Sequence, residues 1–152
     1  MRRVVIGVGN AYRGDDGAGL AVVERLRGRV PEGTDVVASE EEPTRLMDVW
    51  EGADSVVVVD AVASGSEPGV LHRFDATADA VPTRMFRSST HAFGVGEAIE
   101  LARALGTLPG QVLVYGIEGA EFDAREGLSP PVEAAVERLA NTVLEELCTS
   151  AR

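Results

Sequence analysis

The hydrophobic positions of the chain form short continuous runs separated by stretches with helical spacing. Aliphatic runs occupy residues 4–6, 35–38, 55–62 and 112–117. The last two of these runs show almost no alternation with polar residues, which is typical of strands that are covered on both faces of a sheet. Residues 70–74 alternate apolar and polar side chains instead. That pattern predicts a half-exposed edge strand running antiparallel to its neighbour.

Apolar residues at helical spacing follow most of these runs. Residues 20–26 and 95–105 carry them in the i, i+3, i+4 pattern, which predicts amphipathic helices. A longer apolar stripe at 132–147 follows Ser129 and Pro130. Serine at the N-cap and proline in the first turn are a favourable start for a helix.

The order of these elements predicts the fold class and the number of domains. Strands that alternate with helices predict a three-layer α/β/α sandwich. We expect a mostly parallel sheet of about five strands, one of them antiparallel at an edge. The chain has 152 residues, which is enough to bury about two-thirds of its unfolded surface. We therefore expect residues 1–152 to form one domain.

Charge and composition exclude several classes of partner. The formal net charge is -11, which argues against nucleic acid and anionic membranes because both surfaces are negative. No apolar run approaches the ~20 residues of a membrane span. Arg2 and Arg3 lead into a strand rather than a signal peptide. The only cysteine is Cys148, so no internal disulfide is expected. We expect a cytoplasmic monomer.

A glycine-rich turn at residues 7–19 joins the first strand to the first helix. Its five glycines allow a tight turn and a close approach of the backbone. A dinucleotide fingerprint needs glycine where Tyr12 stands, and a phosphate-binding P-loop needs a lysine that the turn lacks. Asp15 and Asp16 stand where a phosphate would bind. The turn therefore suits a cation better than an anion, although either aspartate also suits a helix cap.

Three polar side chains are expected at the carboxyl ends of the strands, where ligands gather in open α/β sheets. Asp16 follows the first strand, Asp60 ends the central one, and His91 precedes a helix that starts at the same edge. We expect Asp16 and His91 at the exposed rim of the sheet. Two carboxylates and an imidazole are suitable ligands for a first-row transition metal, but these ligand types alone do not distinguish among nickel, zinc and cobalt.

Simpler interpretations exist for several of these polar residues. His91 also suits a helix cap or a surface position, and His72 lies on the polar phase of its strand, which predicts a surface histidine. Residues 40–42 are three adjacent glutamates before a short helix at 46–50. A solvated loop is the default interpretation of such a run. Gly-x-Ser-x-Gly, His-Glu-x-x-His and Cys-x-x-Cys motifs are all missing from the sequence.

The chain resembles the hydrogenase maturation proteases, which process the large subunit of nickel-iron hydrogenases. The resemblance extends over nearly the whole chain, and the order and spacing of six short segments carry it. These are Gly7-Val8-Gly9-Asn10 with Asp15-Asp16-Gly17-Ala18-Gly19, Val57-Val58-Val59-Asp60-Ala61, Thr90-His91, Tyr115-Gly116-Ile117-Glu118 and Leu128-Ser129-Pro130.

This resemblance implies an endopeptidase that removes a C-terminal extension from the hydrogenase large-subunit precursor after nickel insertion. In that family the cut follows a basic residue. The metal-contacting residues of the family match Asp16, Asp60 and His91, and the nickel is carried by the precursor, so no organic cofactor is implied. Where the family has an Asp-Gly-Gly-Thr-like turn, this chain has Glu41-Glu42-Pro43-Thr44. The resemblance implies that Glu41 takes the place of the aspartate, whereas the default interpretation of the glutamate run is a solvated loop.

Three other functions remain open at this point. A nucleotide-binding module of Rossmann type predicts affinity for nucleotides. A non-enzymatic nickel-delivery factor predicts metal transfer without a cut peptide. A peptidase with another substrate, such as a spore protein, has the same fold and a less close resemblance.

Overall fold

The computed structural model describes residues 1–40, 45–82 and 94–150. Five strands form one sheet in the order β2-β1-β3-β5-β4. The strands are β1 (Arg3–Val8), β2 (Thr34–Ser39), β3 (Ser55–Val62), β4 (Leu71–Asp75) and β5 (Gln111–Glu118). All neighbours pair in parallel except β4, which pairs antiparallel with β5 at one edge. The predicted sheet is confirmed.

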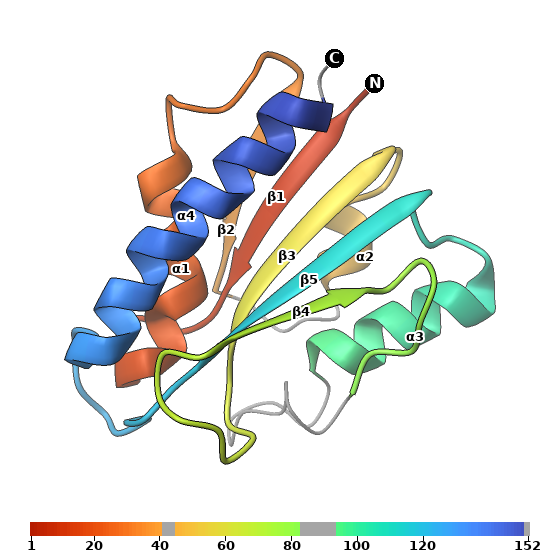
Figure 1. Ribbon diagram of the computed structural model, residues 1–152. Coiled ribbons are helices and arrows are strands. Elements are labelled where there is room, and N and C mark those ends of the chain that lie inside the picture. The colour runs from red at the N-terminus through yellow and green to blue at the C-terminus, as the bar shows by residue number, and fades with distance from the viewer. Residues whose placement is uncertain (41–44, 83–93, 151–152) are drawn as a thin grey trace.

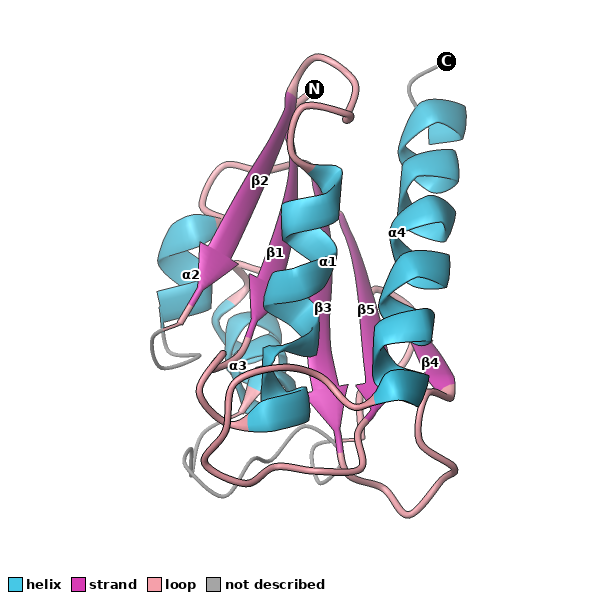
Figure 2. Cartoon of the chain, turned by 90° about the vertical axis from the view of Figure 1, so that its left-hand side faces the viewer, coloured by secondary structure: helices cyan, strands magenta, loops and turns pink. Residues whose placement is uncertain are grey.

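Helices cover both faces of this sheet, which gives the predicted three layers (Figures 1 and 2). The helices are α1 (Ala18–Leu26), α2 (Leu46–Val49), α3 (Val95–Leu105) and α4 (Pro130–Ser150), and a short 3-10 helix, η1 (Gly14–Gly17), precedes α1. Helices α1 and α4 pack on one face and α2 and α3 on the other. Within the described ranges, no helix is long and apolar enough to cross a membrane.

Alternate residues of the central strands form the two apolar layers. Val56 and Val58 of β3 lie with the side chains of α2 and α3. Val57 and Val59 of the same strand lie with those of α1 and α4. This period of two is the expected geometry of a strand buried on both faces.

Two glycines allow α1 to pack directly against the sheet. A Cβ atom on Gly7 would lie 2.2 Å from the carbonyl oxygen of Gly19, and a Cβ atom on Gly19 would lie 2.3 Å from the carbonyl oxygen of Val59. Only glycine avoids these clashes, so the close approach predicted for the glycine-rich turn is an approach of the chain to itself. Helix α1 therefore begins close to the carboxyl ends of β1 and β3.

Candidate functional site

Asp16 lies in η1, directly after β1 and before α1. Its side chain is buried, with only 3% of the residue exposed. The backbone carbonyl of Asp16 accepts a hydrogen bond from Asn10 N–H at 3.3 Å. A Cβ atom on Gly9 would lie 2.0 Å from that carbonyl oxygen, so the glycine lets the turn close tightly. The turn therefore fixes the position of Asp16 through its backbone.

Asp60 lies two residues before the end of β3, because the strand continues to Val62 rather than ending at the carboxylate. Only 6% of the residue is exposed. The alternation of the strand places Asp60 on the same face as Val58 and Val62, which is the face covered by α3. One carboxylate oxygen accepts a hydrogen bond from the backbone N–H of Ala61 at 2.8 Å. The sequence analysis expected Asp16 at an exposed rim, and that prediction is wrong because Asp16, like Asp60, is buried.

Asp16 and Asp60 interact electrostatically across the end of the sheet. Burial raises the pKa of the Asp60 carboxyl well above its usual value, and the negative charge of Asp16 raises it further, while the hydrogen bond from Ala61 lowers it. Two carboxylates that are taken out of water beside one another repel. A proton or a metal cation between them relieves that repulsion, so the pair is suited to hold positive charge.

His91 lies outside the described residues, so its predicted role stays a prediction. Helix α3 begins at Val95, on the face of the sheet toward which Asp60 points. Among the residues that the structure describes, no group of three or more His, Cys, Asp or Glu side chains could hold a metal ion. Of the three predicted metal contacts, the structure therefore describes Asp16 and Asp60, and their role as metal ligands stays a prediction.

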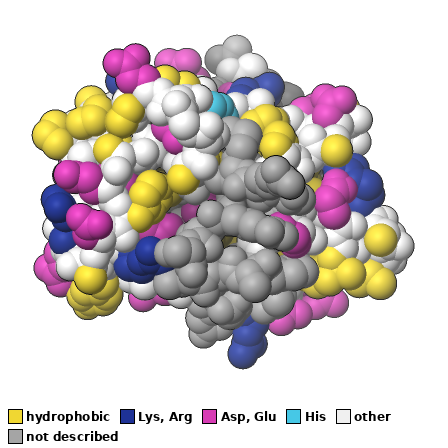
Figure 3. Space-filling model, turned by 90° about the horizontal axis from the view of Figure 1, so that it is seen from below, with side chains coloured by type: hydrophobic (Ala, Val, Ile, Leu, Met, Phe, Trp, Pro, Cys, Tyr) yellow, Lys and Arg dark blue, Asp and Glu magenta, His cyan; other side chains and the backbone are white. Residues whose placement is uncertain are grey.

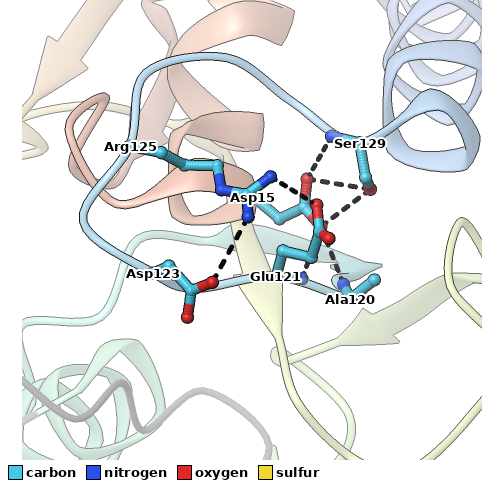
Figure 4. Close-up of polar contacts among 6 residues, drawn as sticks. All are labelled: Asp15, Ala120, Glu121, Asp123, Arg125 and Ser129. Atoms are coloured by element: carbon cyan, nitrogen blue, oxygen red, sulfur yellow. Dashed lines mark hydrogen bonds and ion pairs between the residues drawn. The ribbon is translucent and has the colours of Figure 1, made fainter.

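Asp15, in contrast, is a structural residue of the loop between β5 and α4 (Figure 4). Its carboxylate accepts the backbone N–H groups of Ala120, Glu121 and Ser129 at 2.8, 2.9 and 2.7 Å. The Ser129 hydroxyl also donates to it. Burial alone would raise the pKa of Asp15, but these hydrogen bonds outweigh it and hold the pKa below its usual value.

The same loop is joined to the turn by backbone hydrogen bonds. Gly14 N–H donates to the carbonyl of Arg125 at 2.8 Å, and Asp15 N–H donates to the carbonyl of Glu121 at 2.7 Å. Arg125 in turn forms ion pairs with Glu121 and Asp123 (Figure 4).

Neither η1 nor α1 has a side-chain cap, so the interpretation of Asp15 and Asp16 as helix caps is wrong. The two adjacent aspartates therefore have different environments. Asp15 accepts several hydrogen bonds, whereas Asp16 interacts with the carboxylate of Asp60.

The sequence analysis missed the environment of a further buried carboxylate at this edge, Glu118. Glu118, the last residue of β5, accepts hydrogen bonds from the backbone N–H and the hydroxyl of Ser64 and pairs with His72 Nε2 at 3.1 Å. Burial raises the pKa of the Glu118 carboxyl, but these bonds outweigh it and lower the pKa overall. The surface prediction for His72 is wrong, because 18% of its side chain is exposed and its ring contacts Glu118.

Two hollows lined by described residues lie at opposite ends of the sheet. One, of about 490 Å³, is at the amino ends of the strands and includes Arg3, Arg73 and Glu146. The charged side chains of this hollow stabilise the fold, because Arg3 donates a hydrogen bond to the α4 carbonyl of Leu147 and Arg73 forms an ion pair with Glu146. A second hollow, of about 340 Å³, borders Gly17 beside Asp16. Acidic and apolar side chains are spread over the face that carries the carboxyl ends of the strands (Figure 3).

Comparison with known proteins relates this arrangement to a family. The family model of hydrogenase maturation proteases matches residues 20–146, a range that includes Asp60 and His91 and begins after Asp16. The hydrogenase expression/formation protein HupD of Thiocapsa roseopersicina is 31% identical over 90% of this chain and 67% of its own length. This chain therefore spans about two-thirds of that relative.

Two proteins of Escherichia coli match over greater shares of their own lengths. The hydrogenase 2 maturation protease is 27% identical over 97% of this chain and 91% of its own. The solution structure of an endopeptidase superposes with a TM-score of 0.82 at 26% identity, over 99% of this chain and 94% of that one. The likeness extends over the whole sheet and its helices.

Proposed function

The chain belongs to the hydrogenase maturation protease family and is an endopeptidase, and we propose that it removes the C-terminal extension of a nickel-iron hydrogenase large-subunit precursor after nickel insertion. The observation that carries this proposal is the buried pairing of Asp16 with Asp60 at the carboxyl ends of the strands. A relative of similar length is a hydrogenase 2 maturation protease, which supports a precursor of the same class as the substrate.

In this proposal Asp16, Asp60 and His91 contact the nickel that the precursor carries. The nickel is part of the substrate and not a resident cofactor of the protease, and no organic cofactor takes part. Carboxylate and imidazole groups are suitable ligands for a first-row transition metal. The mutual repulsion of Asp16 and Asp60 supports the assignment, because a cation between them offsets the cost of burying two like charges.

Two uses of such a contact are chemically reasonable. The contact can dock the precursor so that its tail lies correctly for hydrolysis, which is a contribution of positioning. The metal can also polarise the scissile carbonyl or activate the attacking water. In both cases hydrolysis adds water across one peptide bond and releases the extension as a separate peptide.

The proposal also includes the compartment, the oligomeric state and the macromolecular partner of the protein. We propose that it acts as a monomer in the cytoplasm, with the precursor as its macromolecular partner. The single, exposed Cys148 supports a reducing compartment, since a lone cysteine cannot form an internal disulfide. The acidic net charge of -11 supports a partner other than nucleic acid.

The nucleotide-binding alternative has little support. Gly7 and Gly19 face backbone carbonyls of the same chain. The place of a phosphate at the start of the helix is taken by Asp15 and Asp16, both buried. The glycines therefore serve the packing of the turn.

The test is to incubate the protein with a nickel-loaded precursor and to measure the mass of the large subunit. We expect a shortened chain and a released C-terminal peptide, and we expect Asp16→Ala and His91→Ala to leave the precursor intact. Loss of nickel from the precursor to the protein without any shortened chain would support a nickel-delivery factor instead. Full processing by both variants would contradict the assignment of the site.

A further inference from the structure

Three polar side chains lie in register across the amino ends of the strands, at the end of the sheet opposite the candidate site. Arg3 of β1 pairs with Ser55 of β3, and Ser55 pairs with Gln111 of β5. They project from the face that α1 and α4 cover, because Val57 and Leu113, two positions further along, pack on that face. These residues all line the hollow of about 490 Å³, a volume within the range of small-molecule sites.

Arg3 brings a buried positive charge to this hollow. Only 6% of the residue is exposed, and its Nε is buried without a hydrogen-bond partner. The guanidinium donates from Nη1 to the α4 carbonyl of Leu147 at 2.7 Å, and it forms no ion pair with any described residue. A guanidinium has five N–H donors and is not deprotonated in proteins. Most of its hydrogen-bonding capacity is therefore unused by the described residues.

The end of α4 offsets only part of the charge of Arg3. Leu147 lies in the last turn of α4, where the helix dipole is equivalent to about half a negative elementary charge. A buried charge without a full counter-charge is costly to the fold. An anion bound in the hollow beside Arg3 supplies the missing negative charge.

The other charged residues of the hollow favour one kind of anion. Arg73 and Glu146 form an ion pair with each other, and Glu145 adds an exposed carboxylate. The two glutamates repel a multiply charged anion such as phosphate more strongly than a singly charged one. A carboxylate carries a single charge and has the planar geometry that matches a guanidinium. The apolar walls at Val57 and Leu113 favour a hydrocarbon body on the same ligand.

We propose that this hollow binds the carboxylate of a small, singly charged organic acid with an apolar body. Arg3 is its charged partner, and Ser55 and Gln111 are further hydrogen-bonding groups. The Ser55 hydroxyl lies 3.4 Å from the side-chain oxygen of Gln111, so the amide NH2 of Gln111 is available as a donor. The site does not depend on the proposed function, because Asp16 and Asp60 lie at the opposite ends of the strands.

The test is an NMR titration of the isotope-labelled protein with hexanoate, which carries one carboxylate on an apolar chain. We expect saturable shifts of the signals of Ser55, Val57 and Leu113, with a Kd on the order of 1 mM. Neutral hexanamide and inorganic phosphate should each bind about tenfold more weakly. Equal binding of hexanoate and hexanamide, or no saturable binding of hexanoate, would overturn the proposal. Tighter binding of N-acetyl-Gly-Gly-Leu than of hexanoate would overturn the assignment to a small acid in favour of a peptide C-terminus.

Two variants locate the binding to this hollow. Arg3→Gln removes the positive charge and should abolish saturable binding of hexanoate. Gln111→Glu changes an exposed residue, so it tests the site even if Arg3→Gln does not fold, and its added negative charge should weaken hexanoate binding about tenfold. Ala104→Glu, which adds the same charge at an exposed position of α3 outside the hollow, should bind hexanoate as wild type does. Equal affinities of Gln111→Glu and Ala104→Glu would show that hexanoate binds elsewhere.

Discussion

Asp15 accepts both the backbone N–H and the hydroxyl of Ser129, at 2.7 and 2.8 Å, although the two residues are 114 positions apart in the chain. Ser129 lies at the start of α4, and its carbonyl accepts the first helical hydrogen bond from Glu133 at 2.9 Å. Instead of capping its own helix with its side chain, the serine uses its hydroxyl to join that helix to the glycine-rich turn.

This junction predicts a specific loss of stability in Ser129→Ala. The variant keeps the backbone donor and removes a hydroxyl that donates to a buried carboxylate, a bond worth about 2 kcal/mol. We expect the free energy of unfolding in urea to fall by about that amount. Asp123→Asn, which alters an exposed carboxylate of the same loop, is the control. A loss no larger than that of the control would show that the hydroxyl does not stabilise the junction.

Asp60→Asn should make the protein more stable while removing its activity. The pKa of Asp60 is raised in the folded state by burial and by Asp16. A carboxyl with a raised folded pKa contributes stability below its unfolded pKa of about 4, and that contribution is lost as pH rises through the folded value. The neutral amide has no such loss. We therefore expect the unfolding free energy of the variant to exceed that of wild type at pH 7–8, and the excess to disappear near pH 4.

The control for this experiment is two residues away in the same strand. Val58→Ala removes two methyl groups from a position that is completely buried and should destabilise the protein by about 2 kcal/mol without acting on the site. If Asp60→Asn destabilises the protein as Val58→Ala does, Asp60 is a structural residue and its assignment to the site is wrong.

The fold and part of this site could be predicted from sequence because they depend on local pattern. The bounds of β3 agree with the predicted run at 55–62, since a strand buried on both faces needs apolar side chains in succession. The roles of Asp15 and His72 could not be predicted. Their partners are Ser129 and Glu118, which are distant in sequence, and alternation within one strand does not reveal what the next strand presents.

The stability of the Glu118 cluster should depend on pH with the opposite sign to that of Asp60. Its hydrogen bonds with Ser64 and His72 lower the pKa of Glu118 in the folded state despite burial. A lowered folded pKa stabilises the protein above the unfolded pKa of about 4.3, and this stability is lost as pH falls through the folded value. Glu118→Gln should therefore cost most at pH 6–7 and progressively less below about pH 4, as measured by urea unfolding.

Glu67→Gln, at an exposed glutamate of the loop before β4, should show no such dependence on pH. A constant difference between wild type and Glu118→Gln from pH 7 to pH 3 would mean that the ionised carboxylate adds nothing to the stability of this cluster.

The central claim is that the protease recognises nickel carried by its substrate through Asp16, Asp60 and His91. Two carboxylates and one imidazole are an open ligand set, which should bind metal weakly until the substrate completes the coordination sphere. The most direct measurement is a side-by-side digestion of nickel-loaded and nickel-free precursor, after the metal content of the purified protease has been determined. We predict a protease that holds little metal and cuts only the nickel-loaded precursor. Equal cutting of both precursors would contradict nickel recognition.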